Sequence, residues 1–122
     1  MTFDEALNNW LNNKSNGIGF ILTKDDPFLC IDLDNCVSEK GRVDNHAAEI
    51  VSKFNSYTEL SPSGRGIHIW CKGKLPKAGI KTKRWEAYQS GRYMTVTMNR
   101  ICGEIIENQE AIEWLLASGG NE

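Results

Sequence analysis

Two aspartates one residue apart, Asp32 and Asp34, are the first candidates for chemistry in this sequence. They occur in "CIDLDNC", residues 30–36, a stretch that otherwise has the composition of a buried β-strand. Because strand side chains alternate between two faces, both carboxylates are expected on one face, about 6 to 7 Å apart. Like charges this close repel, and a bound divalent cation removes the repulsion. The pair therefore predicts a metal site; the alternative is a turn that Asp34 caps.

A second candidate site lies in "SPSGRGIHIW", residues 61–70, where a turn of small residues leads into an alternating strand. Small turn residues allow backbone N–H groups to approach an anion, and Arg and His side chains add charge and donors. The pattern lacks the Lys-Ser/Thr ending of a Walker P-loop. The alternative is a hairpin turn followed by a half-buried histidine. The predicted phosphate-binding residues are Ser63, Gly64, Arg65, Gly66 and His68.

The net charge of −2 is unevenly distributed along the chain. Residues 65–100 contain nine Lys and Arg residues and a single acid, Glu86. Such a basic segment indicates contact with polyphosphate or nucleic acid, and the alternative is a solvated loop. Glu86 is either an ion-pair partner, for which Arg92 is a candidate, or a site residue. The candidate DNA-binding residues are Lys72, Lys74, Lys77, Lys81 and Lys83.

Apolar periodicity and turn residues predict the elements that carry these motifs. This order of elements favours an α+β fold in which a small mixed β-sheet is flanked by helices. A chain of 122 residues is long enough for one domain with its own core, so residues 1–122 are expected to form a single domain. We expect helices over residues 3–13, 43–54 and 108–116, and strands over residues 18–22, 28–34, 56–60, 66–70, 84–88 and 93–97.

The four cysteines form no C-x-x-C pair, and the chain has no signal peptide and no apolar stretch of membrane-spanning length. These features predict a cytoplasmic protein without a membrane partner. Cys36 and His46 do not have the regular spacing that would predict a zinc site.

Three motifs together resemble those of the archaeo-eukaryotic primase superfamily, in the primase-polymerase (prim-pol) type found in phages and plasmids. They are D-x-D at residues 32–34, S-x-S-G-x-G-x-H at 61–68, and W-E-x-Y with S-G-R-Y-x-T-V-T at 85–97. The resemblance implies an RRM-like catalytic core that uses Mg²⁺ or Mn²⁺. It implies that Asp32, Asp34 and Glu86 are catalytic and bind two metal ions. It also implies that His68 and its neighbours contact nucleotide phosphates, and that Arg92 and Lys83 hold triphosphate or template.

The chain departs from the family pattern at two places. It opens at a helix that follows a further segment in longer relatives, so we expect an N-terminally shortened core. Met98 stands where the glycine of "TVTG" is usual.

The expected function is template-dependent nucleotidyl transfer by a DNA primase/polymerase core. Its expected partners are single-stranded DNA, nucleoside triphosphates and a helicase or other replication protein. The competing interpretation is a non-catalytic module that holds nucleotide or single-stranded DNA for a partner, and a nuclease using the same acids is a third. Convergence of the three acids favours catalysis, because a binding module does not need three carboxylates at one point.

Overall fold

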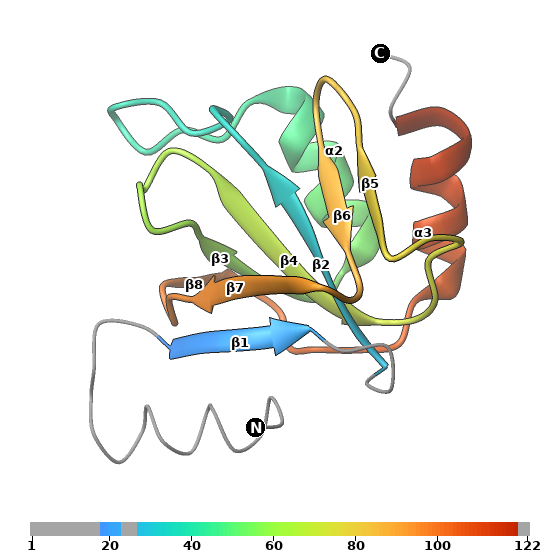
Figure 1. The fold of residues 1–122 in the computed structure, drawn as a ribbon. Coiled ribbons are helices and arrows are strands. Elements are labelled where there is room, and N and C mark those ends of the chain that lie inside the picture. Colours follow the sequence, from blue (N-terminus) through green and yellow to red (C-terminus); the bar gives the residue numbers. More distant parts are fainter. Residues whose placement is uncertain (1–17, 23–26, 120–122) are drawn as a thin grey trace.

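The computed structural model describes residues 18–22 and 27–119, so the helix expected over residues 3–13 lies outside the described residues (Figure 1). The expected α+β fold is confirmed. No helix in the described part of the chain is long and apolar enough to span a membrane. The elements are β1 (Ile18–Leu22), β2 (Phe28–Leu33), α2 (Asn45–Phe54), β3 (Tyr57–Leu60), β4 (Ile67–Lys72), β5 (Gly79–Lys81), β6 (Glu86–Tyr88), β7 (Arg92–Val96), β8 (Arg100–Cys102), α3 (Gln109–Trp114) and the π-helical segment η1 (Leu115–Gly119).

The described strands form two sheets. A six-stranded sheet has the order β5-β6-β2-β4-β3-β8, and its ladders are antiparallel, with one isolated parallel bridge between Lys72 and Glu107. The strands β1 and β7 pair antiparallel as a second sheet. Several bounds differ from the expectation, and two of the differences concern the candidate site: β2 ends at Leu33, before Asp34, and β6 begins at Glu86. Strands β5 and β8 are additional, and their exposed residues carry no apolar alternation that would predict them.

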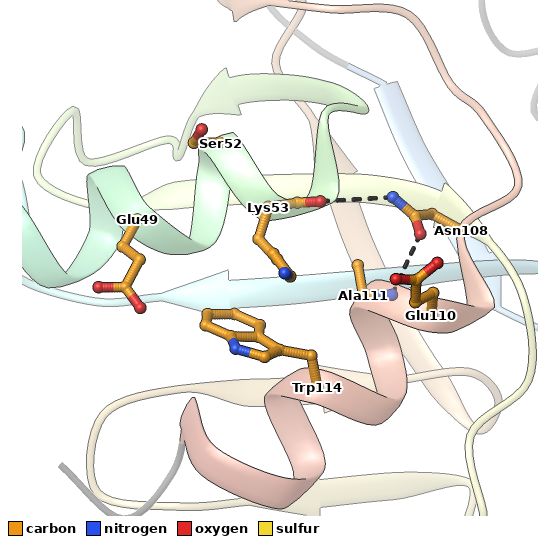
Figure 2. A pocket seen from close by; sticks show the side chains of 7 residues that line it. All are labelled: Glu49, Ser52, Lys53, Asn108, Glu110, Ala111 and Trp114. Carbon is orange, nitrogen blue, oxygen red and sulfur yellow. Dashed lines mark hydrogen bonds between the residues drawn. The ribbon is translucent and has the colours of Figure 1, made fainter.

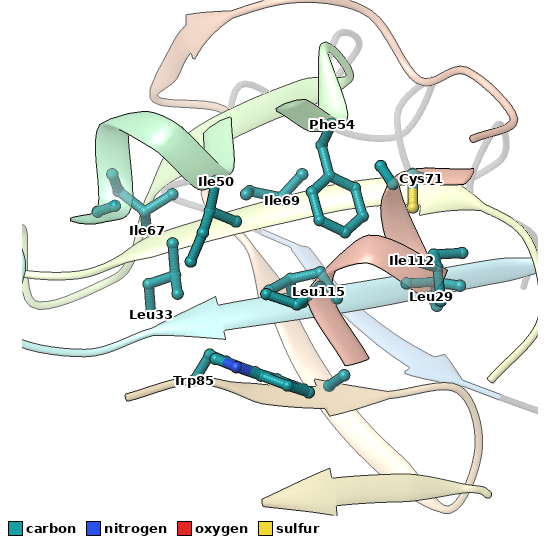
Figure 3. Packing of buried hydrophobic residues seen from close by; sticks show 14 of the residues in the cluster. Leu29, Leu33, Ile50, Phe54, Ile67, Ile69, Cys71, Trp85, Ile112 and Leu115 are labelled. Atoms are coloured by element: carbon teal, nitrogen blue, oxygen red, sulfur yellow. The ribbon is translucent and has the colours of Figure 1, made fainter. Parts of the chain in front are cut away.

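One face of the six-stranded sheet packs against α2 and α3 (Figure 1). Alternation along β2 sends Leu29, Ile31 and Leu33 to this face, where they meet Ile50 and Phe54 of α2 (Figure 3). Burial of such side chains stabilises a fold by about 1.5 to 3 kcal/mol each. This core holds β2 and β4 firmly, so the residues on their opposite face have a rigid support.

Helix α2 begins and ends with local capping contacts. The Oδ1 of its N-cap, Asp44, accepts the N–H of Ala47 at 2.8 Å. Its C-cap, Asn55, has a φ of 49°, the left-handed conformation that commonly ends a helix. The helix is thereby fixed in length between the loop after β2 and the start of β3.

The opposite face of the six-stranded sheet is covered in part by β1 and β7, which run across it (Figure 1). Leu22 of β1, with Met94 and Val96 of β7, packs on Cys30 and Trp70 from β2 and β4. The residues of β2 that share a face with Cys30 therefore lie beside β7, and Asp32 is the next of these.

Candidate active site

A row of six ionisable residues crosses the whole six-stranded sheet, with one residue from each strand. Each residue is the register partner of its neighbour, and directly opposed residues on antiparallel strands share a face. The row begins and ends with exposed cations and has acids and a histidine between them. In sheet order, it contains Lys81, Glu86, Asp32, His68, Glu59 and Arg100.

His68 lies between two carboxylates in this row. Its Nε2 is 3.6 Å from Oδ1 of Asp32, and its Nδ1 is 3.6 Å from Oε2 of Glu59. The carbonyl oxygen of Thr95, on β7, is 3.2 Å from Nδ1. Burial lowers the pKa of His68, but the hydrogen bond to Glu59 and the charges of Asp32 and Glu59 outweigh burial, so the pKa is raised above its ordinary value. The ring is held firmly, and the residue is only 5% exposed.

Two of the three predicted acids are neighbours in the row. Asp32 is directly opposite Glu86, and both residues are partly exposed. The hydroxyl of Tyr88 donates a hydrogen bond to Oε1 of Glu86. Asp34 is exposed and lies beyond the end of β2, so strand alternation does not govern its direction. Within residues 18–22 and 27–119, no three His, Cys, Asp or Glu side chains are grouped closely enough to hold a metal ion. The structure thus brings Asp32 and Glu86 together and leaves Asp34 to one side.

The small-residue turn before β4 is closed by its own hydrogen bonds. The N–H of Gly64 donates to the carbonyl of Ser61, that of Arg65 to Oγ of Ser63, and that of Gly66 to Oγ of Ser61. The expectation that these amides are free to approach an anion is therefore wrong. The side chain of Arg65 lies 3.4 Å from Glu39 in an exposed ion pair.

Gly66 is required by a close approach of two backbones. A Cβ at this position would lie 2.7 Å from the carbonyl oxygen of Leu33. Gly64 differs, because its φ is +75° and a Cβ there would meet open space. Gly66 therefore brings the start of β4 against the end of β2, next to Asp34.

The predicted DNA-binding lysines are all exposed but do not form one cluster. Lys72, with Lys74 after it, is at the end of the sheet where Phe28 begins β2, and its Nζ lies 5.6 Å from the centre of the Phe28 ring. Lys81 and Lys83 lie at the opposite end, where β5 turns into β6. Lys77 comes between the two groups in the chain.

Basic residues from the turn between β5 and β6 line a small pocket together with an aspartate of the D-x-D motif. It has a volume of about 200 Å³, and its lining includes Asp34, His46, Lys83 and Arg84. Arg92 opens β7, where its backbone pairs with Leu22. Lys81 is thus the register partner of Glu86, and Lys83 and Arg84 line the pocket together with Asp34.

A separate surface pocket of about 520 Å³ lies between α2 and α3 (Figure 2). Figure 2 shows Lys53 beside the ring of Trp114, with Nζ 5.6 Å from its centre, and Asn108 bonded to the backbone at Lys53. None of the predicted site residues lines this pocket, which is on the helical side of the sheet.

The sequence analysis did not predict Glu59, which lies between His68 and Arg100 in the row. It is completely buried and accepts the N–H groups of Thr97 and Met98. The available signal was a charge inside the short strand "YTEL", directly before the serine-rich turn. The same kind of signal, a charge in an otherwise buried strand, identified Asp32.

The antiparallel sheet, the acids on its β1–β7 side and the three motifs are consistent with a phage-type primase-polymerase domain. No protein-family model matches the chain. The chain is 43% identical, over 119 aligned residues, to a protein of Nitratiruptor phage NrS-1 named DNA Primase-polymerase. The alignment covers 92% of this chain and 16% of that protein. The resemblance predicted from the motifs is confirmed by this similarity, which concerns a small part of the phage protein.

Proposed function

We propose that this domain is the core of a DNA primase/polymerase that joins nucleoside triphosphates on a single-stranded DNA template. The observation that carries the proposal is the adjacency of Asp32, Glu86 and His68 in one row, each contributed by a different motif. The similarity to part of a phage DNA primase-polymerase supports the same activity.

Carboxylate oxygens are the ligands that hard divalent ions such as Mg²⁺ or Mn²⁺ prefer. Asp32 and Glu86 would hold them, and the exposed Asp34 would join after rotation of its side chain. When bound, such ions lower the pKa of an attacking hydroxyl and neutralise charge on the transferred phosphoryl group.

The protein's own residues have distinct parts in this proposal. His68, fixed through Nδ1, presents Nε2 on the side of Asp32, and in the doubly protonated form of the ring Nε2 can donate to a phosphate oxygen. Arg65 lines a pocket with Asn35 and Cys36, just after β2, and Lys83 lines another with Asp34, so both supply charge near the end of β2. Exposed lysines bind the template backbone without sequence preference.

The direct test is primer synthesis and extension on single-stranded DNA with Mg²⁺ or Mn²⁺. We expect incorporation that depends on the added metal, with Asp32→Asn as the inactive control. If the folded wild-type chain, alone and together with a helicase or other replication protein, adds no nucleotide with either metal, the catalytic proposal is wrong.

A second candidate function is favoured by the position of Asp34. Because Asp34 does not join the other two acids in the described structure, the domain could hold nucleotide or single-stranded DNA for a partner replication protein without catalysis. In that case single-stranded DNA binding would persist in Asp32→Asn, and no condition would give incorporation.

A further inference from the structure

Glu59 is a completely buried carboxylate whose two oxygens are both engaged. Its Oε2 accepts the N–H of Thr97 at 2.9 Å and lies 3.6 Å from Nδ1 of His68. Its Oε1 accepts the N–H of Met98 at 3.3 Å. A buried carboxylate is costly unless it is hydrogen-bonded and paired, and Glu59 satisfies both conditions. Burial of a neutral residue would have a smaller desolvation cost, which suggests that the charge has a function.

The contacts of Glu59 fix the chain just after β7. Thr97 donates its hydroxyl to the carbonyl of Leu60 at 2.6 Å, and the N–H of Leu60 donates to the carbonyl of Asn99 at 2.9 Å. Met98 has a φ of 65°, a left-handed conformation that is unfavourable for a non-glycine residue. The carboxylate of Glu59 accepts the N–H of this unfavourable residue and so helps to hold it.

The same strand also supplies the second acceptor for His68. Thr95, two residues before Thr97 on β7, places its carbonyl oxygen 3.2 Å from Nδ1 of His68. Glu59 therefore acts on the ring twice, directly through Oε2 and indirectly by holding the end of β7. Because a carboxylate and a carbonyl oxygen both accept, Nδ1 carries a proton, and Nε2 is the nitrogen on the side of Asp32.

We propose that Glu59 is a positioning residue that locks the His68 ring with Nε2 toward Asp32 and toward the incoming nucleotide. The kinetic part of this inference rests on the proposed function, whereas the ring geometry does not. Residues that orient a metal-ligating histidine through its other nitrogen commonly change metal affinity or activity about 10- to 100-fold when replaced, and we expect an effect of similar size for a phosphate-binding histidine. Glu59 would have this role although it touches neither DNA nor nucleotide.

The test is nuclear magnetic resonance of the imidazole N–H groups, which is simple because the chain has two histidines, His46 and His68. A His46→Gln variant assigns the signals. We expect a slowly exchanging Nδ1–H signal of His68 in the wild type, because burial and two acceptors protect this proton. If the wild-type protein shows no protected Nδ1–H, the inference is overturned whatever the activity.

Two variants separate ring positioning from general loosening of β7. Glu59→Gln keeps the size but replaces one acceptor oxygen with an N–H₂ group, so we expect at least tenfold faster exchange of the His68 proton. Thr97→Val removes the hydroxyl contact to Leu60 and leaves the carboxylate in place, so we expect slow exchange to persist. Equal exchange rates in Glu59→Gln and wild type, or equal acceleration in both variants, would contradict a specific role for Glu59.

Kinetics with the full chain complete the test. We expect Glu59→Gln to raise the nucleotide KM about 10- to 100-fold, as for other residues that orient a functional group, with single-stranded DNA affinity unchanged. Thr97→Val should stay close to wild type, because it removes the hydroxyl contact to Leu60 and leaves the carboxylate of Glu59 in place. A wild-type chain without activity would refute the proposed function, while the exchange experiment would still decide the role of Glu59.

Discussion

Asp32 and His68 face each other across β2 and β4, with Oδ1 of Asp32 3.6 Å from Nε2 of His68. The acid and the ring come from different sequence motifs, and the strand register alone makes them neighbours. On its other side, Asp32 is opposite Glu86. Asp32 is therefore the central residue of the candidate site, and its replacement affects both neighbours.

Neutral replacements of the two paired acids should abolish incorporation. We expect Asp32→Asn and Glu86→Gln each to lower the rate of nucleotide incorporation by more than about 100-fold, because each removes a charged metal ligand. Loss of a direct ligand should have a larger effect than loss of a residue that only orients a ligand. Primer extension at saturating metal measures this effect, and Glu110→Gln, on the helical side, is the matched control. Wild-type rates in either acid variant would show that the row is not the metal site.

Asp34 allows a sharper test, because the structure leaves it apart from the other acids. Its exposure predicts that Asp34→Asn changes the free energy of unfolding by no more than about 0.5 kcal/mol. If Asp34 rotates into the site, incorporation should still fall as far as in Asp32→Asn. Normal incorporation in Asp34→Asn would mean that Asp32 and Glu86 act without it.

Single-stranded DNA affinity should weaken steeply with salt if the exposed lysines bind phosphate. Each lost phosphate contact should flatten the slope of log affinity against log salt by about 0.7. Charge reversal of Lys72, Lys74, Lys77 and Lys83 is therefore expected to flatten the slope, measured by fluorescence anisotropy. Lys81 is kept, because it is opposite Glu86 and its reversal would also disturb the acids.

The control for the lysine variants is reversal of two acids on α3, Glu110→Lys and Glu113→Lys. These changes should not flatten the slope. Equal slopes for the two sets would mean that the lysines only keep the edge of the sheet solvated.

Two glycines with positive φ should differ strongly in their tolerance of a side chain. Gly91→Ala, with φ of +70° and open space around its Cβ, should cost about 1 to 2 kcal/mol of backbone strain. Gly103→Ala has similar strain at φ of +80°, and its Cβ would also lie 2.3 Å from the carbonyl oxygen of Ser56. Chemical denaturation should therefore show a clearly greater loss of stability for Gly103→Ala, and equal losses would contradict the close approach of Gly103 to Ser56, just before β3.

Thiol reactivity should separate Cys102 from the other three cysteines. Burial raises the pKa of Cys71 to about 12 and that of Cys36 to about 11, and the pKa of the buried Cys30 is also raised. At pH 8 these groups remain neutral thiols, which do not react as nucleophiles. Iodoacetamide should therefore label only Cys102 in the folded protein and all four cysteines after unfolding, as counted by mass spectrometry. Rapid native labelling of Cys71 would indicate an open core.

Local patterns predicted the parts of the fold that depend on local physics. Alternation along residues 28–33 and the apolar face of α2 both reflect burial, and the structure contains both elements nearly as expected. The strands β5 and β8 could not be predicted in this way. Their residues are largely exposed, and they are strands because β6 and β3 offer free edges to pair with.

The candidate site was predictable in its residue types but less so in its contacts. The partners of Glu59 are the N–H groups of Thr97 and Met98, which are far away in the sequence and have no side-chain signature. In the turn before β4, the hydroxyls of Ser61 and Ser63 accept backbone N–H groups, and composition does not determine which hydroxyls take these positions. Met98 is a third example. The sequence showed only that methionine replaces the glycine usual at this position, whereas its left-handed φ explains why glycine suits the position.

The order of the six-residue row has a consequence for how the protein folds. Its members follow each other in space as residues 81, 86, 32, 68, 59 and 100, an order unrelated to their order along the chain. Three of its pairs, Asp32 with His68, Asp32 with Glu86 and Glu59 with Arg100, are far apart in the sequence, and such contacts require closure of long loops, which slows folding. No short fragment contains the row, so a nascent chain acquires the arrangement only after Arg100 has been synthesised and β8 has docked on β3.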